Sequence, residues 1–180
     1  DLGNAPDDAL TCMRLARALA QDNRLVEAIT TIRDQLIEVA RVEIPTEEKK
    51  AENKLDNVKN WGAQLGLRVL LAELLADRHL YSRALTAINQ ALALGPVDRS
   101  PLLQKKANFL IEMRRYEAAA SFLDEAELEF PDHAGLRLER ASLYAETGEY
   151  EAAEAIQRSL INTYPGHVAL KAQLGQTLLW

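Results

Sequence analysis

Three histidines and one cysteine are the side chains of this 180-residue chain best suited to bind a metal ion or to act as a nucleophile. The histidines are His79, His133 and His167, and the last two follow Pro131 and Pro165 at matching positions. Residues at matching positions of a repeat lie one repeat apart, which is too far for a shared metal ion, and no second ligand lies at helical spacing. We therefore predict histidines with structural or solvent-exposed roles and no metal site.

The cysteine and the carboxylates offer little more catalytic chemistry. Cys12 lies on the expected packing side of a helix, where a small thiol behaves as an apolar residue. A run of carboxylates predicts a solvated helix surface and loop: Glu117, Asp124, Glu125, Glu127, Glu129 and Asp132. No glycine-rich phosphate loop, metalloprotease helix motif or nucleophile elbow occurs in the sequence. We predict that the chain is not an enzyme and uses no cofactor.

Composition limits the function classes further. The net charge of −6 argues against binding to nucleic acid and against binding to an anionic membrane surface, because proteins bind both through clustered Lys and Arg. The segment 112–154 alone carries 12 acidic and 4 basic residues. No apolar run is long enough to span a bilayer, so we expect no membrane insertion and a soluble compartment, cytoplasmic or periplasmic. The sequence starts at Asp1 without a signal-peptide pattern, so we expect a mature product or a piece of a longer protein.

The elements that position these residues repeat along the chain. Tyr-Glu-Ala-Ala at 116–119 recurs at 150–153, and Phe-Pro at 130–131 recurs as Tyr-Pro at 164–165, both 34 residues apart. An earlier copy of the same pattern, 35 residues before, consists of Tyr81, Ala84, Ile88, Ala91 and Pro96. A first, degenerate copy has Ala40 where the proline is expected. Ala and Leu make up roughly a third of the chain, which favours helices.

This pattern resembles the tetratricopeptide repeat, whose signature is Trp-x-x-Leu-Gly-x-x-Tyr, then Ala-x-x-x-Phe, then Pro. Ala119 and Leu123 match the second half, whereas Gln157 replaces the large apolar residue in the last full repeat, which we interpret as looser or facing a partner. The first half keeps a small residue in each copy, at Ala72, Ala107, Ala141 and Gly175. The resemblance implies an all-α, right-handed α-solenoid of antiparallel helix pairs.

Glycine and proline positions in the repeats predict where the helices end. Gly148 is placed to be the left-handed cap of a first helix, and the prolines end the second helices. We expect helices at 7–21, 25–43, 62–78, 82–94, 100–113, 117–129, 134–147, 151–163 and 168–180. The predicted domains are a degenerate first pair at 1–43, an inserted charged helix or linker at 44–61, repeats at 62–98, 99–133 and 134–167, and the first helix of a further repeat or a terminal helix at 168–180. Trp61 offers an alternative start, so that the inserted helix would run on into the next one.

In tetratricopeptide proteins the first helix of each repeat lines a concave groove that holds a partner segment. By that resemblance the groove here would present Arg68, Val69, Glu73, Gln104, Lys105, Asn108, Ile111, Leu138, Ser142 and Glu146. Gln104 and Asn108 lie one turn apart, so their amides could hold a partner's backbone, and Ile111 would add an apolar contact. Members of the family that clamp a C-terminal carboxylate need bases or amides where this sequence has Glu73 and Glu139. A basic, apolar or neutral segment is favoured instead.

We predict a non-catalytic scaffold that binds a protein or peptide segment, as part of a larger bacterial protein or assembly. The alternatives are a structural spacer or self-association module, and a regulatory domain attached to an enzyme or to polysaccharide or secretion machinery. The apolar residues of 168–180 would leave one helix face uncovered. The chain is then either a fragment of a longer array, which we favour, or it self-associates through residues 168–180.

Overall fold

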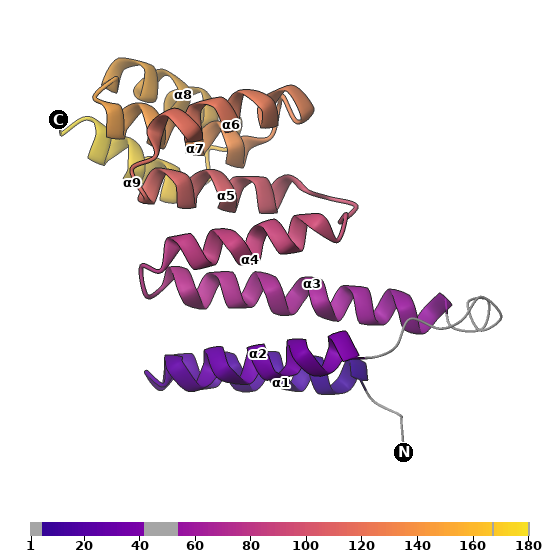
Figure 1. Ribbon diagram of the computed structural model, residues 1–180. Coiled ribbons are helices and arrows are strands. Elements are labelled where there is room, and N and C mark those ends of the chain that lie inside the picture. The colour runs from indigo at the N-terminus through magenta and orange to yellow at the C-terminus, as the bar shows by residue number, and fades with distance from the viewer. Residues whose placement is uncertain (1–4, 42–53, 167, 180) are drawn as a thin grey trace. The chain divides into compact units, whose positions relative to one another are not determined.

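The computed structural model describes residues 5–41, 54–166 and 168–179. Within these residues every regular element is a helix (Figure 1). The helices are α1 (Ala5–Gln21), α2 (Leu25–Arg41), α3 (Lys54–Ala76), α4 (Tyr81–Ala93), α5 (Ser100–Glu112), α6 (Tyr116–Glu129), α7 (Ala134–Thr147), α8 (Tyr150–Thr163) and α9 (Val168–Thr177). The predicted all-α fold of antiparallel helix pairs is confirmed.

The helix predicted over 62–78 differs most from its prediction, because α3 begins at Lys54. The second half of the inserted segment is therefore the beginning of a repeat helix, and residues 42–53 lie outside the described residues. Trp61 lies inside this helix, and its indole Nε1 donates a hydrogen bond of 2.7 Å to the carbonyl oxygen of Leu94. The indole thereby joins the added turns of α3 to the end of α4.

The chain forms two compact units, unit 1 (Asp1–Val97) and unit 2 (Asp98–Trp180). In unit 1, α1 packs on α2, both pack on α3, and α3 packs on α4. Its main core cluster contains Ala16, Ala28, Ile32 and Leu67, all completely buried. In unit 2, α5 packs on α6 and α7, α6 and α8 both pack on α7, and α9 packs on α8.

Small residues occupy the helix crossings, as the repeat predicts. Six alanines at these positions are 0% exposed: Ala72, Ala84, Ala107, Ala119, Ala141 and Ala153. A buried alanine lets two helices approach closely, and the remaining volume is filled by larger side chains such as Ile88, Leu123 and Leu160. Gly175 differs, because a Cβ atom there would meet nothing within 4 Å among the described atoms.

One turn geometry joins the two helices of each pair. A residue with positive φ stands two positions before the second helix in all four pairs: Asn23 (61°), His79 (56°), Arg114 (55°) and Gly148 (85°). The next residue donates its N–H to the carbonyl five residues back, as from Leu80 to Leu75 at 2.9 Å. This is the Schellman pattern of a helix C-terminus. The left-handed cap predicted at Gly148 is confirmed, and three residues other than glycine adopt the same conformation.

The interpretation of the last full repeat as looser or facing a partner rests on Gln157, but this side chain of α8 faces the interior and not a partner. Its side chain is 0% exposed, and its Nε2 donates to the hydroxyl of Thr177 in α9 at 2.9 Å. Among the described residues its Oε1 has no hydrogen-bond partner. The polar replacement thus connects α8 to α9 instead of opening the last full repeat.

Candidate functional site

The first helices of unit 2 lie side by side and are joined by polar contacts. α5 packs on α7, and Gln173 of α9 donates from Nε2 to the hydroxyl of Ser142 in α7 at 2.8 Å. The Ser142 hydroxyl donates to the carbonyl oxygen of Leu138 at 3.1 Å. We call the set formed by Gln104, Asn108, Glu139, Ser142 and Gln173 the polar row. It spans α5 and α7, which carry predicted groove residues, and α9, which carries none.

Glu139 is the central member of the polar row. Its carboxylate accepts from Gln104 Nε2 at 3.1 Å and from Asn108 Nδ2 at 3.3 Å, so α5 and α7 are joined by two hydrogen bonds. The residue is only 7% exposed, and within the described part of the chain no Lys, Arg or His pairs with it. Burial, the largest cause, raises the pKa of this carboxyl above its ordinary range, against the lowering effect of the two amide donors. Sequence reasoning treats Glu139 only as an obstacle to a carboxylate clamp and misses this network.

Gly135, in the first turn of α7, makes room for the Gln104 side chain. A Cβ atom at this position would collide with the Gln104 amide and crowd the His133 ring. His133 caps the same helix, because its Nδ1 accepts the backbone N–H of Leu136 at 3.2 Å. The absence of a side chain at Gly135 therefore lets Gln104 reach Glu139.

The predicted hot spot of the groove needs correction. Ile111 is 6% exposed, so it belongs to the core and offers no apolar contact to a partner. The amide nitrogens of Gln104 and Asn108 each donate one N–H to Glu139, which leaves each amide its second N–H for a partner. Both side chains remain half-buried at the surface.

The other predicted groove residues of unit 2 lie at or near the surface. Lys105, Leu138 and Ser142 are half-buried, and Glu146 is exposed. The hydroxyl of Tyr116 donates to Glu146 at 3.3 Å, which links α6 to α7. The structure thus brings together the α5 and α7 residues of the prediction around the polar row.

The predicted groove residues of unit 1 all lie on α3 and are half-buried: Arg68, Val69 and Glu73. Arg68 donates from Nη1 to the backbone oxygen of Gln64 at 3.2 Å and to its Oε1 at 3.1 Å. Among the described atoms its buried Nε has no partner, and burial lowers the pKa of its guanidinium.

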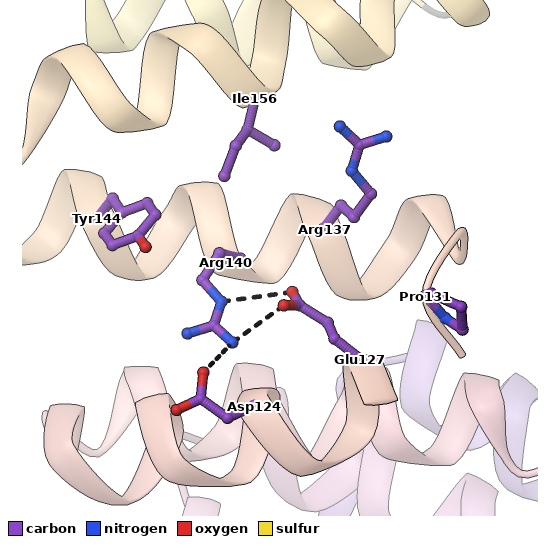
Figure 2. A pocket seen from close by; sticks show the side chains of 7 residues that line it. All are labelled: Asp124, Glu127, Pro131, Arg137, Arg140, Tyr144 and Ile156. Atoms are coloured by element: carbon purple, nitrogen blue, oxygen red, sulfur yellow. Dashed lines mark hydrogen bonds and ion pairs between the residues drawn. The ribbon is translucent and has the colours of Figure 1, made fainter. Parts of the chain in front are cut away.

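A cleft of about 370 Å³ opens between α6, α7 and α8 (Figure 2). Arg140, whose side chain is 11% exposed, spans it and binds Glu127 at 3.0 Å and Asp124 at 2.6 Å. Arg137 instead turns toward α8 and donates to the hydroxyl of Ser159 at 3.2 Å. Glu127 is therefore an ion-pair partner that ties α6 to α7, not part of a solvated surface as predicted. Arg140 thus engages both carboxylates of the cleft within the chain.

The other candidates for chemistry have structural surroundings. Cys12 is 7% exposed, its Sγ lies 3.6 Å from the carbonyl oxygen of Thr31, and burial raises its pKa, so the thiolate is disfavoured. His79 Nδ1 contacts the hydroxyl of Tyr81 at 2.9 Å, and His167 lies outside the described residues. No three His, Cys, Asp or Glu side chains of the described chain lie close enough to hold a metal ion. None of the described helices is both long and apolar enough to cross a membrane.

Comparison with known proteins agrees with this architecture. Residues 110–174 match the sequence profile of the tetratricopeptide repeat. This segment carries tetratricopeptide repeats. No curated protein matches the chain in sequence.

Solved structures, two of them described as TPR proteins, share the fold at low sequence identity. MamA from Desulfovibrio magneticus RS-1, solved from residue 41 to its end, is 15% identical with a TM-score of 0.61, over 99% of this chain and 86% of that one. TTC0263 from Thermus thermophilus is 19% identical with a TM-score of 0.55, over 96% and 100%. YrrB, described as a TPR protein with an unusual peptide-binding site, is 16% identical with a TM-score of 0.53, over 94% and 76%. At these identities the similarity establishes the fold alone.

Proposed function

We propose that the chain is a non-catalytic scaffold whose unit 2 binds an extended segment of a partner protein along α5, α7 and α9. The polar row carries this proposal. A layer of helices that only had to pack would bury apolar side chains, whereas these three helices place half-buried amides and a hydroxyl around the buried carboxylate of Glu139. Such groups suit a peptide backbone, which needs both donors and acceptors.

The charge of this layer selects the partner. Glu146 is exposed and Glu139 has no base among the described residues, so a lysine or arginine of the partner segment is favoured and an acidic segment is repelled. The peptide-binding site named for YrrB, which has the same fold, supports a peptide as the ligand class.

A displayed library of random peptides, selected on the purified full chain, tests the proposal. We expect enrichment of segments with one or more Lys or Arg, and backbone amide NMR shifts on binding that concentrate in α5, α7 and α9. Glu146→Lys should weaken the selected peptides about tenfold, because it places a like charge in the site. The matched control is Glu151→Lys, which makes the same charge change at an exposed position of α8 and should have little effect. Equal loss in both variants, or shifts confined to other helices, would contradict the proposal.

Self-association is the second candidate, and the exposed apolar residues of the C-terminal region favour it. Leu178 is 53% exposed and Leu179 is 86% exposed. Exposed neighbouring leucines mark contact surfaces more often than solvated ones. Sedimentation velocity over a concentration series distinguishes the two candidates, since Leu178→Ser and Leu179→Ser together should abolish any dimer while leaving peptide binding intact.

A further inference from the structure

A second cleft, of about 420 Å³, lies within unit 1 between α2 and the turn that joins α3 to α4. α2 contributes Val26, Ile29, Thr30 and Arg33 to its lining, which are spaced as one stripe of a helix. Val26 is 69% exposed, whereas Ala28 and Ile32 on the same helix are completely buried. The stripe therefore lies at the edge of the core face of α2: Ile29 packs against the core cluster of unit 1, whereas Val26 is exposed to solvent.

The opposite wall of the cleft comes from the α3–α4 turn and the start of α4, which contribute Arg78, Leu80 and Arg83. The left-handed residue His79 and the bond from Leu80 N to Leu75 O, 2.9 Å, fix the shape of this turn. Leu80 is 40% exposed, so it and Val26 place apolar surface on both walls. Adjacent exposed apolar side chains at a concave site usually mark an interface.

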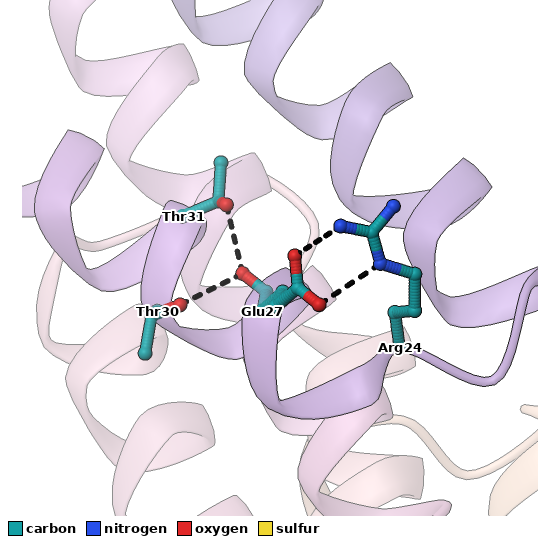
Figure 3. A network of polar contacts seen from close by, with 4 residues as sticks. All are labelled: Arg24, Glu27, Thr30 and Thr31. Carbon is teal, nitrogen blue, oxygen red and sulfur yellow. Dashed lines mark hydrogen bonds and ion pairs between the residues drawn. The ribbon is translucent and has the colours of Figure 1, made fainter.

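The side chains that line the cleft carry a net positive charge. Three arginines surround the cleft and no acidic side chain lines it. Within the described residues, Arg33, Arg78 and Arg83 take part in no ion pair or side-chain hydrogen bond. The acidic residue of the first turn of α2, Glu27, is occupied by Arg24, with 2.9 Å between Arg24 Nε and Glu27 Oε1 (Figure 3).

We propose that this cleft binds an acidic segment of another protein that carries an aliphatic side chain between its carboxylates. Guanidinium groups pair with carboxylates in a fixed, often bidentate geometry, and three unpaired arginines are a site for such groups. The aliphatic side chain would lie against Val26, Ile29 and Leu80, and the removal of this apolar surface from water would stabilise the complex. This site is separate from the polar row of unit 2 and would take a ligand of opposite charge.

Two other occupants fit less well. A nucleic-acid strand would leave the apolar walls without a partner, and its affinity depends on more phosphate contacts than three arginines supply. In a second copy of this chain, the acidic segment 112–154 carries 12 of the 27 acidic residues, and most of those 12 are already engaged within the chain. The engaged ones are Asp124, Glu127, Glu129, Glu139, Glu146, Glu149 and Glu154.

Fluorescence anisotropy with the full chain tests the proposal, using the labelled peptide Glu-Asp-Leu-Glu-Asp-Leu-Glu-Asp as the probe. We expect saturable binding that weakens with added salt. Arg33→Gln and Arg83→Gln should each raise the Kd at least about fivefold, and the double variant more, because each removes a charge-assisted contact. Val26→Ser, at a position too exposed to affect folding strongly, should also weaken the probe.

Matched controls separate the cleft from general attraction between charges. Arg17→Gln removes an exposed arginine of α1 that does not line the cleft, and should change the Kd less than about twofold. A probe with Gln and Asn in place of the acids, and one with Ser in place of Leu, should both bind at least about fivefold more weakly. Thermal unfolding of each variant, followed by circular dichroism, verifies that it is folded.

Four results with the probes and variants would overturn the proposal. They are no binding of the acidic probe, equal binding of the uncharged probe, a loss with Arg17→Gln as large as with Arg33→Gln, and tighter binding of a 12-nucleotide single strand that displaces the probe. A dimer in sedimentation that Arg33→Gln dissociates would assign the cleft to a second copy and would also overturn it. None of these results depends on the polar row, so they test the cleft of unit 1 independently of the peptide binding proposed for unit 2.

Discussion

Glu139 shows how one buried polar side chain can serve both packing and binding. A carboxylate removed from water is unfavourable unless donors compensate it, and here two amides do so without supplying charge. Glu139 therefore connects α5 and α7 with a defined geometry, but the two amides offset only part of the free energy lost when its carboxylate leaves water. A partner's cation could offset the rest.

The pH dependence of stability should reveal this residue. Because burial raises the pKa of Glu139, the folded chain retains a proton that the unfolded chain has already released. Its contribution to stability is therefore greatest below the ordinary carboxyl pKa and is lost as the pH rises through the raised value. We expect the free energy of unfolding of the wild type, relative to Glu139→Gln, to fall as the pH rises from about 4 to 7.

Urea unfolding at each pH measures this difference. Glu146→Gln serves as the control, because it removes the same charge at an exposed position of α7. The prediction fails if the wild type and Glu139→Gln differ by the same amount at every pH.

Single residues are also where sequence reasoning is weakest. A helical period tells which face a residue lies on only to within about one position, and Ile111 lies at the edge of the core face. Gln157 suggests a surface position because it is polar, but it is buried because Thr177 supplies a partner 20 residues later. Such partners depend on packing between repeats, which no local pattern encodes.

At the scale of elements, the four Schellman turns are the most regular feature of the chain. The left-handed region is unfavourable by about 1 to 2 kcal/mol for residues with a Cβ, and less so for Asn. Gly148 is the residue type most typical of such a turn, and Asn23 is the next most typical. The equivalent turns at His79 and Arg114 are predicted from the repeat period and not from their residue types.

Arg114→Gly should therefore stabilise the chain. Glycine relieves the backbone strain at φ 55°, but it also raises the conformational entropy of the unfolded chain. The net increase in the free energy of unfolding is then up to about 1 kcal/mol. The neighbouring Arg115→Gly removes the same exposed charge at φ −89°, where glycine brings only the entropy loss, and should destabilise. Chemical denaturation of both variants measures the effect, and midpoints that shift in the same direction would refute the explanation.

The alanines at helix crossings make a second prediction at this scale. Ala153 is completely buried in α8, so Ala153→Leu should overpack the contact with α7 and destabilise by about 1 to 3 kcal/mol. Ala155→Leu adds the same atoms at an exposed position of the same helix and should change stability by less than about 0.5 kcal/mol. Thermal melting distinguishes them, and equal effects would mean that the repeat alanines are not close-packing positions.

At the scale of the whole chain, the sequence predicts architecture better than sites. Two markers with one 34-residue period are enough for the helix pairs, because each pair must stack on a neighbour to cover its apolar face. The arginine cleft is not predicted, since Arg33 and Arg83 lie 50 positions apart and belong to different pairs. Only the folded unit brings them to one surface.

The two proposed sites lie in different units and favour opposite charges, which makes a reciprocal test possible. Unit 2 carries 13 acidic and 9 basic residues, and its polar row holds an uncompensated carboxylate, whereas the cleft of unit 1 is lined by three arginines. Glu146→Lys should weaken basic peptides and leave the acidic probe within about twofold of its wild-type Kd. Arg33→Gln should do the reverse. Each probe is titrated separately by anisotropy, because the two peptides would bind one another in a mixture. If either substitution weakened both probes equally, one shared surface would have to replace the two separate sites.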